Sequence, residues 1–147
     1  MLTEEKTTLT FISIDFTSLN QDFPYIDQGI ACGFPSPAED LGDATIDLNS
    51  LLIKNPATTF FARVKGDSMH DAGITEGDIV VVDRSLEPQD NKIAVCFIDG
   101  EFTIKRIKME QKRILLIAEN KNYKPIIVTE SNEFIIWGIV TNVIKQF

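Results

Sequence analysis

The segment KIAVCFIDGEFTIKRIK, residues 92–108, decides the fold, because two apolar runs with a period of two flank an Asp99-Gly100 pair. Val, Ile, Phe and Thr favour strands, and Asp-Gly is a strong signal for a two-residue hairpin turn with positive φ at both central residues. A loop of this length fixes the register, so Ala94 is predicted to face Lys105. The lysine therefore has space beside it.

Five further runs with the same composition and period surround this hairpin. They are TTFFARVK (58–65), DIVVVDR (78–84), RILLIAE (113–119), PIIVT (125–129) and FIIWGIVTNVI (134–144). Such short β-branched and aromatic runs, bounded by turn-forming residues, are typical of strands. The sequence therefore predicts a mainly β domain over residues 58–147.

The N-terminal third has a different character. Residues 1–31 sustain neither a long helical nor a long strand period, so we expect an arm rather than a domain. Two prolines in ACGFPSP (31–37) remove amide donors and favour extended backbone, which predicts an exposed extended linker. The apolar spacing of the residues that precede Pro56 fits a short helix or turn, capped by Asp47 or Asn49.

Length and charge narrow the class of protein. The 147 residues are 44% hydrophobic and 24% charged, which suits one sizeable core with an appendage. The net charge is -8, and residues 1–53 account for all of it, with nine acidic residues and Lys6 as the one base. Because such a surface repels a phosphate backbone, we expect no direct sequence-specific DNA binding.

Signals for export or membrane insertion are missing. Glu4 and Glu5 stand where a signal peptide carries positive charge, and the longest apolar run, 134–140, is too short to span a bilayer. Cys32 and Cys96 are expected to be free thiols, because a chain with its own core needs no disulfide. The sequence thus predicts a soluble cytoplasmic protein with no membrane association.

Common ligand-binding patterns are missing as well. His70 is the single histidine, and it fits a surface imidazole in a turn. One histidine and two distant cysteines do not make a zinc site. Gly66, Gly73 and Gly77 do not match the phosphate-binding loops. We therefore expect no metal and no cofactor.

The remaining candidate chemistry is a serine and a lysine. In GDSM (66–69), a glycine permits a sharp turn that aims the Ser68 hydroxyl outward, with the amides of Asp67 and Ser68 facing a developing oxyanion. A neutral lysine can take the serine proton, and burial can lower the pKa of Lys105 from about 10.4 to about 7. Taken alone, the two residues also fit an ordinary turn serine and a solvated sheet lysine.

The order of several motifs is more specific. CGFPSPAEDL (32–41), IDLNSLLIKNP (46–56), GDSM (66–69), GITEGDIVVVD (73–83) and DGEFTIKRI (99–107) resemble the UmuD family, the self-cleaving accessory subunits of SOS mutagenesis. That family lies within the wider group of LexA-like Ser-Lys peptidases. The resemblance implies a compact β domain of curved antiparallel sheets, like that of LexA and signal peptidases, with an extended N-terminal arm.

The resemblance also implies roles for individual residues. Ser68 would be the nucleophile and Lys105 the general base of a serine endopeptidase, and Cys32-Gly33 would be the bond that the protein cuts in its own arm. The chain would then divide into a cleavable arm (1–32), an extended linker with a short helix or turn (33–57) and a Ser-Lys peptidase-like β domain (58–147).

Partners are implied by the resemblance alone. In the family, the shortened form is an accessory subunit of an error-prone Y-family translesion DNA polymerase, which here would be UmuC-like. Cleavage is stimulated by RecA filaments on single-stranded DNA, and the family members are homodimers.

Three other functions stay open at this point. A LexA-type or phage-type repressor would share the Ser-Lys domain, but residues 1–31 are too few and too acidic for a helix-turn-helix domain. A signal peptidase relative acting on other proteins would need a membrane anchor. A non-catalytic module that binds another protein through its sheet is the main alternative that is not an enzyme.

Overall fold

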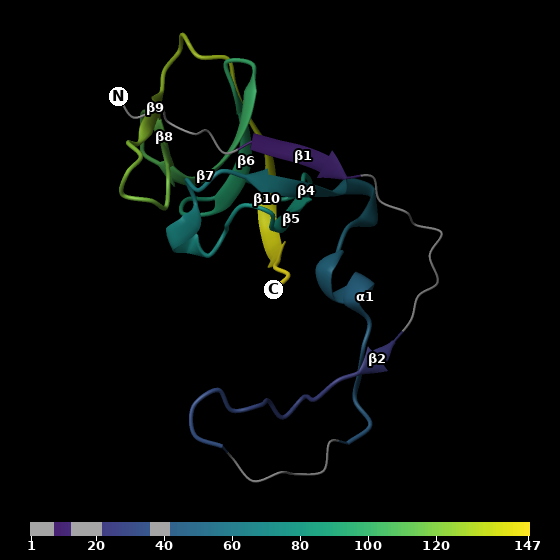
Figure 1. The fold of residues 1–147 in the computed structure, drawn as a ribbon. Helices are drawn as coiled ribbons and strands as arrows, with labels where there is room; N and C mark the ends of the chain where they lie inside the picture. The colour runs from purple at the N-terminus through teal and green to yellow at the C-terminus, as the bar shows by residue number, and fades with distance from the viewer. Residues whose placement is uncertain (1–7, 13–21, 36–41) are drawn as a thin grey trace. The chain divides into compact units, whose positions relative to one another are not determined.

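The computed structural model describes three stretches of the chain, residues 8–12, 22–35 and 42–147 (Figure 1). The described parts of residues 1–14 and 55–147 form one compact unit, and those of residues 15–54 form a second. The first unit contains an antiparallel sheet of eight strands. Within the described stretches, no helix combines the length and the apolar character that a membrane crossing requires.

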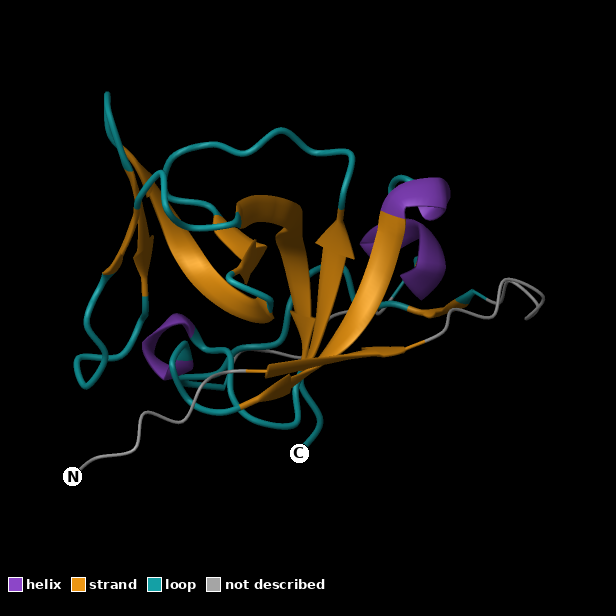
Figure 2. Ribbon diagram, turned by 90° about the horizontal axis from the view of Figure 1, so that it is seen from above, coloured by secondary structure: helices purple, strands orange, loops and turns teal. Residues whose placement is uncertain are grey.

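The eight strands follow an order that differs from their order in the chain. From one edge to the other they are β1 (Thr8–Ile12), β4 (Thr59–Lys65), β5 (Ile79–Asp83), β10 (Phe134–Ile144), β6 (Ile93–Ile98), β7 (Glu101–Met109), β8 (Ile114–Ile117) and β9 (Ile126–Val128). Strands β6 to β9 are consecutive, and β10 lies between β5 and β6. The sheet is strongly curved (Figure 2). All seven strand runs predicted from the sequence are confirmed, and so is the mainly β, antiparallel fold.

The hairpin between β6 and β7 has the predicted geometry. Asp99 and Gly100 have φ angles of 48° and 85°, which a type I′ turn requires. Ala94 pairs with Lys105 across the two strands. The turn and the register are therefore confirmed.

Strand β6 is covered on both faces. Val95 belongs to one buried apolar cluster, whereas Ala94 and Cys96 belong to another. Successive side chains of a strand point to opposite faces, and residues directly opposite each other share a face. Lys105 therefore lies on the face of Ala94, and its neighbour there is the second apolar cluster, which includes Ile107. This placement removes the lysine from water.

Strand β10 contains two irregularities that let it pair with both β5 and β6. Its register shifts between Ile136 and Gly138 against β6 and between Val140 and Asn142 against β5. A Cβ atom at Gly138 would lie 2.6 Å from Val82 Cγ1. A glycine is thus required for the close approach of β10 to β5.

Strand β1 is a feature that the sequence analysis did not anticipate. It pairs with β4 over five residue pairs, from Thr8 with Lys65 to Ile12 with Phe61. The ring centroid of Phe11 lies 5.5 Å from that of Phe102 and 4.9 Å from that of Trp137. A segment of the expected arm is therefore an edge strand of the sheet.

The second unit is small. Strand β2 (Phe23–Pro24) pairs with β3 (Thr45–Ile46), and helix α1 spans Leu48–Leu52. The Asp47 carboxylate accepts hydrogen bonds from Asn49 N at 3.0 Å and Ser50 Oγ at 2.6 Å. The predicted short helix is confirmed, and Asp47 is its cap.

A buried carboxylate closes the end of β5. Asp83 accepts hydrogen bonds from Asn55 Nδ2 at 2.7 Å, from Thr58 Oγ1 in the 3-10 turn η1 (Pro56–Thr58) at 2.8 Å, and from Ser85 N and Oγ at 2.8 and 2.7 Å. Burial opposes ionisation of Asp83, but these hydrogen bonds outweigh it and lower its pKa to about 2. This network holds the segment that precedes β4 next to the C-terminal end of β5.

Candidate active site

Ser68 lies in a tight turn between β4 and the 3-10 turn η2 (His70–Ala72). Gly66, with a φ of 93°, reverses the chain directly after β4. The next residues are held by a hydrogen bond from His70 N to Asp67 O at 3.1 Å, and Met69 is anchored in the first apolar cluster. Ser68 itself is completely buried. The turn that GDSM predicted is therefore present and fixed at both ends, but the expected outward direction of the Ser68 hydroxyl is wrong, because the hydroxyl is buried against Lys105.

Lys105 reaches this serine from β7. Its Nζ lies 3.1 Å from Ser68 Oγ, 2.7 Å from Thr103 Oγ1 and 3.1 Å from Ile104 O. The lysine is only 6% exposed. The structure thus brings together two residues that are 37 positions apart in the chain.

Burial controls the protonation of this lysine. Desolvation lowers the pKa of Lys105 from 10.5 to about 8. Burial also raises the pKa of the nearby Cys96 thiol to about 12, so this thiol is uncharged where Lys105 titrates and supplies no counter-charge. About a tenth of the amine is therefore neutral at pH 7 and about half at pH 8, against less than a thousandth at pH 7 for a lysine of ordinary pKa.

Three oxygen atoms surround the Lys105 amine and accept hydrogen bonds from its Nζ. Ile104 O only accepts hydrogen bonds, and the Thr103 hydroxyl also accepts one from the amine. A neutral amine has two N–H donors for these groups and one lone pair, which is left for the Ser68 hydroxyl. In the structure Nζ donates to Ser68 Oγ as it does to the other two oxygens. Once the amine is neutral, the Ser68 hydroxyl can donate its proton toward Nζ, as general-base catalysis requires. Thr103 was missed in the sequence analysis, although its position two residues before Lys105 places it on the same strand face.

A cleft of about 260 Å³ adjoins the lysine. Its walls include Phe102 and Lys105 from β7, Tyr123 from the loop after β8, and Ile126 from β9. The walls combine apolar side chains with polar groups, as small-molecule and peptide sites commonly do.

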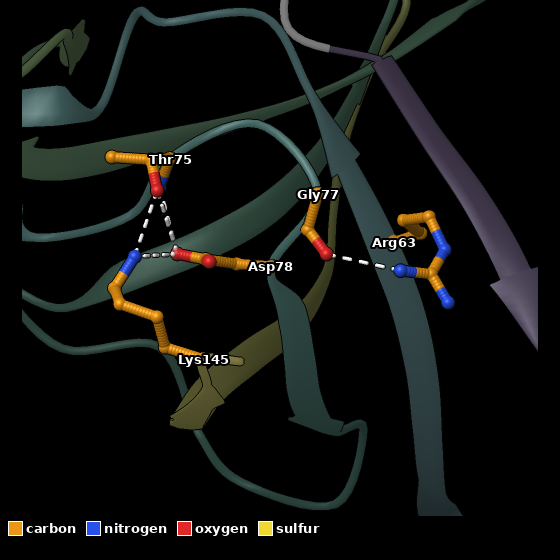
Figure 3. A network of polar contacts seen from close by, with 5 residues as sticks. All are labelled: Arg63, Thr75, Gly77, Asp78 and Lys145. Carbon is orange, nitrogen blue, oxygen red and sulfur yellow. Dashed lines mark hydrogen bonds and ion pairs between the residues drawn. The ribbon is translucent and has the colours of Figure 1, made fainter. Parts of the chain in front are cut away.

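Part of the motif GITEGD (73–78) has a structural role. The Asp78 carboxylate accepts hydrogen bonds from Thr75 N at 2.9 Å and from Lys145 Nζ at 2.5 Å (Figure 3). Burial opposes ionisation of Asp78, but the hydrogen bonds from Lys145 and Thr75 outweigh it and lower its pKa. Arg63 also donates to Gly77 O at 3.0 Å. These contacts fix the turn into β5 against the end of β10.

The other residues named from the sequence lie elsewhere. Cys32 and Gly33 are exposed and belong to the second unit, where the backbone bends at residues 32–34 instead of running as a strand. The following proline has no amide to donate to a ladder. His70 is exposed in η2, with Nδ1 3.4 Å from Asp71 Oδ1, as the sequence analysis expected. Both cysteines are free thiols.

Comparison with known proteins shows one matching family and several similar proteins. The sequence profile of the Peptidase S24-like family matches residues 24–141. Protein ImpA of Salmonella typhimurium is 42% identical over 115 residues, which are 78% of this chain and 77% of ImpA. Protein SamA of Salmonella typhimurium strain LT2 is 41% identical over 123 residues, 84% of this chain and 85% of SamA. Protein MucA of Escherichia coli is 39% identical over 120 residues, 81% of this chain and 82% of MucA.

Proposed function

The chain belongs to the Peptidase S24-like family of serine peptidases, among its UmuD-like proteins of SOS mutagenesis, and from this premise we propose that it cuts its own Cys32-Gly33 bond. In this proposal Ser68 is the nucleophile and Lys105 is the general base. The observation that supports it is the 3.1 Å contact between Lys105 Nζ and Ser68 Oγ, two buried groups from different elements.

The proposed reaction begins with attack on the carbonyl carbon of Cys32. The neutral amine of Lys105 takes the hydroxyl proton as Ser68 Oγ forms its bond to that carbon, and the carbonyl oxygen becomes an oxyanion. Backbone amides of Asp67 and Ser68 are the proposed donors to this oxyanion. Thr103 Oγ1 and Ile104 O, already within hydrogen-bond distance of Nζ, accept from the ammonium that forms.

The reaction then proceeds through an ester. The Lys105 ammonium gives its proton to the amide nitrogen of Gly33, the carbon-nitrogen bond breaks, and the new amino terminus leaves. Cys32 remains esterified to Ser68 Oγ. Lys105, neutral again, takes a proton from water as the water oxygen attacks the ester carbon. The ammonium then returns this proton to Ser68 Oγ as the bond between Oγ and the Cys32 carbon breaks, which releases the fragment 1–32 and restores the neutral amine. No other group needs to change its charge.

We further propose that residues 33–147 form the active product. By family membership, this product would serve as a homodimeric accessory subunit of a Y-family translesion polymerase, and RecA filaments on single-stranded DNA would stimulate its formation. A self-substrate fits an exposed segment in which small residues flank the scissile bond, and Gly33 has open space around it.

The test is the mass of the products after incubation of the purified protein at alkaline pH. We expect a new species that begins at Gly33, absent from Ser68→Ala and from Lys105→Ala. Matched controls are Ser131→Ala, at an exposed serine, and Lys108→Met, at a lysine further along β7. Both should cleave like the unmutated chain. An unchanged mass in the unmutated chain, or cleavage that persists in Ser68→Ala, would overturn the proposal and leave the interaction module as the better hypothesis.

A further inference from the structure

The loop between β8 and β9 contacts the turn that carries Ser68 at two points and the following 3-10 turn η2 at a third. Asn120 Nδ2 donates to Asp67 O at 2.9 Å, and Tyr123 Oη donates to Asp67 Oδ1 at 2.6 Å. Asp71 N donates to Glu119 O at 2.7 Å. The backbone carbonyl and the side chain of Asp67 are therefore both held by residues more than fifty positions away in the chain.

These contacts set the orientation of the peptide group between Asp67 and Ser68. The carbonyl of Asp67 and the amide N–H of Ser68 belong to the same planar unit, and in a trans peptide they point in opposite directions. The structure has no cis peptide among its described residues. Fixing Asp67 O through Asn120 Nδ2 and His70 N therefore fixes the direction of the Ser68 N–H. That N–H is the group proposed above as an oxyanion donor.

The loop is itself organised to make these contacts. Asn120 Oδ1 accepts from Asn122 N at 3.0 Å, so the side-chain amide is oriented with its N–H groups toward Asp67. Tyr123 N donates to Asn120 O at 3.0 Å. Glu119 forms an ion pair with Arg106, the residue that follows Lys105 on β7. The loop thus connects the strand of the lysine to the turn of the serine.

We propose that Asn120 and Tyr123 are positioning residues for self-cleavage, which hold the peptide group between Asp67 and Ser68 so that its N–H faces the oxyanion. This inference rests on the proposed function. Neither side chain touches the reacting atoms in this role, because both act through Asp67. Tyr123 also lines the cleft beside Lys105, so its contact with Asp67 couples a wall of the cleft to the serine turn.

The expected decrease in the self-cleavage rate can be judged from the rate that is lost when one oxyanion donor is removed. Complete loss of such a donor costs about 100-fold to 1,000-fold in rate. Loss of one positioning contact leaves the donor in place but less well directed, because His70 N still binds Asp67 O. We therefore expect a decrease of about 10-fold to 100-fold for a single substitution, a fraction of the full effect.

The experiment uses two conservative variants of the full chain. Asn120→Ser removes the donor to Asp67 O but keeps a neutral side-chain oxygen that can accept from the amide two residues on. Tyr123→Phe keeps the ring in the cleft wall and removes only the hydroxyl. Lys121→Ala, an exposed change in the same loop, is the matched control. Each is followed by its self-cleavage rate as a function of pH and by its thermal unfolding.

We expect both variants to lower the plateau rate at high pH, by about 10-fold to 100-fold, while the midpoint of the pH profile stays where it is in the unmutated chain. The midpoint reports the Lys105 amine, and neither variant alters the contacts of its Nζ with Ser68, Thr103 and Ile104. A merely structural role would lower the unfolding temperature and lose the rate only as unfolded protein accumulates. Lys121→Ala should behave like the unmutated chain.

Two results would overturn the inference. One is a plateau rate equal to that of the unmutated chain in both variants, and the other is a decrease fully explained by the unfolded fraction. If one variant does not fold, the other still decides the question. Failure of the proposed function would look different, because the unmutated chain itself would then show no product, or Ser68→Ala would still cleave.

Discussion

Replacing Lys105 by methionine tests whether burial keeps the amine neutral. The comparison is made in a Ser68→Ala background, so that neither protein can cut itself through the proposed mechanism. Methionine has a similar length and no charge. The quantity of interest is the difference in free energy of unfolding between the lysine and methionine proteins, measured by urea unfolding at several pH values.

The expected difference changes with pH in a defined direction. Lys105 has a pKa of about 8 in the folded protein and 10.5 as its ordinary value. Between these values the unfolded chain binds more protons at this site than the folded one, so stability rises with pH in that window. The full shift corresponds to about 3 kcal/mol of destabilisation by the buried charge below pH 8, which disappears as pH rises through the unfolded pKa.

The measurement therefore has a clear outcome. From about pH 7 to about pH 10, the lysine protein should gain about 2 to 3 kcal/mol of stability relative to the methionine protein. Other titrating groups are common to both proteins and cancel in the difference, as do hydrogen bonds whose energy is independent of pH. A difference that stays flat over this range would refute the reasoning, because it would mean that Lys105 titrates alike in the folded and unfolded states.

Three further predictions concern the fold around the site. The ionised Asp83 carboxylate stabilises the fold by about 2 kcal/mol above its unfolded pKa, and this stability is lost as pH falls toward 2. Asp83→Asn should therefore make the free energy of unfolding less sensitive to acid by this amount, as measured by unfolding at a series of acidic pH values. Phe11→Ala should remove the contact between the Phe11 and Trp137 rings and lower the free energy of unfolding by about 1 kcal/mol. The changed surroundings of this single tryptophan should alter its fluorescence. Gly138→Ala should destabilise by about 1 to 3 kcal/mol in urea unfolding, because its new methyl would meet Val82; an unchanged midpoint would contradict the close approach of β10 to β5.

Features set by neighbouring residues were predictable from the sequence. The Asp99-Gly100 turn fixed the register of its hairpin, and this register placed Lys105 opposite Ala94. The cap of α1 followed from the preference of aspartate for that position, although the sequence alone left Asn49 as an equal choice. In each case the interaction that decides the structure lies within a few residues.

Features set by distant contacts were not predictable in this way. Strand β1 has few residues and a mixed composition, and its ladder with β4 and the packing of Phe11 on Phe102 stabilise it as a strand. Asn120 and Tyr123 meet Asp67 across more than fifty positions, and no local pattern signals that contact. The nucleophile and base were identified as candidates by their motifs, but their contact joins the turn after β4 to strand β7, which are not neighbours in the sheet, and no local pattern signals it.

The pH dependence of self-cleavage by the unmutated chain tests the central claim most directly. The rate at which the chain beginning at Gly33 appears should increase about tenfold per pH unit below the pKa of Lys105 and become constant above it, with a midpoint near 8. A rate that is independent of pH over this range, or that falls as the amine loses its proton while the fold stays intact, would contradict a neutral Lys105 as the base that activates Ser68.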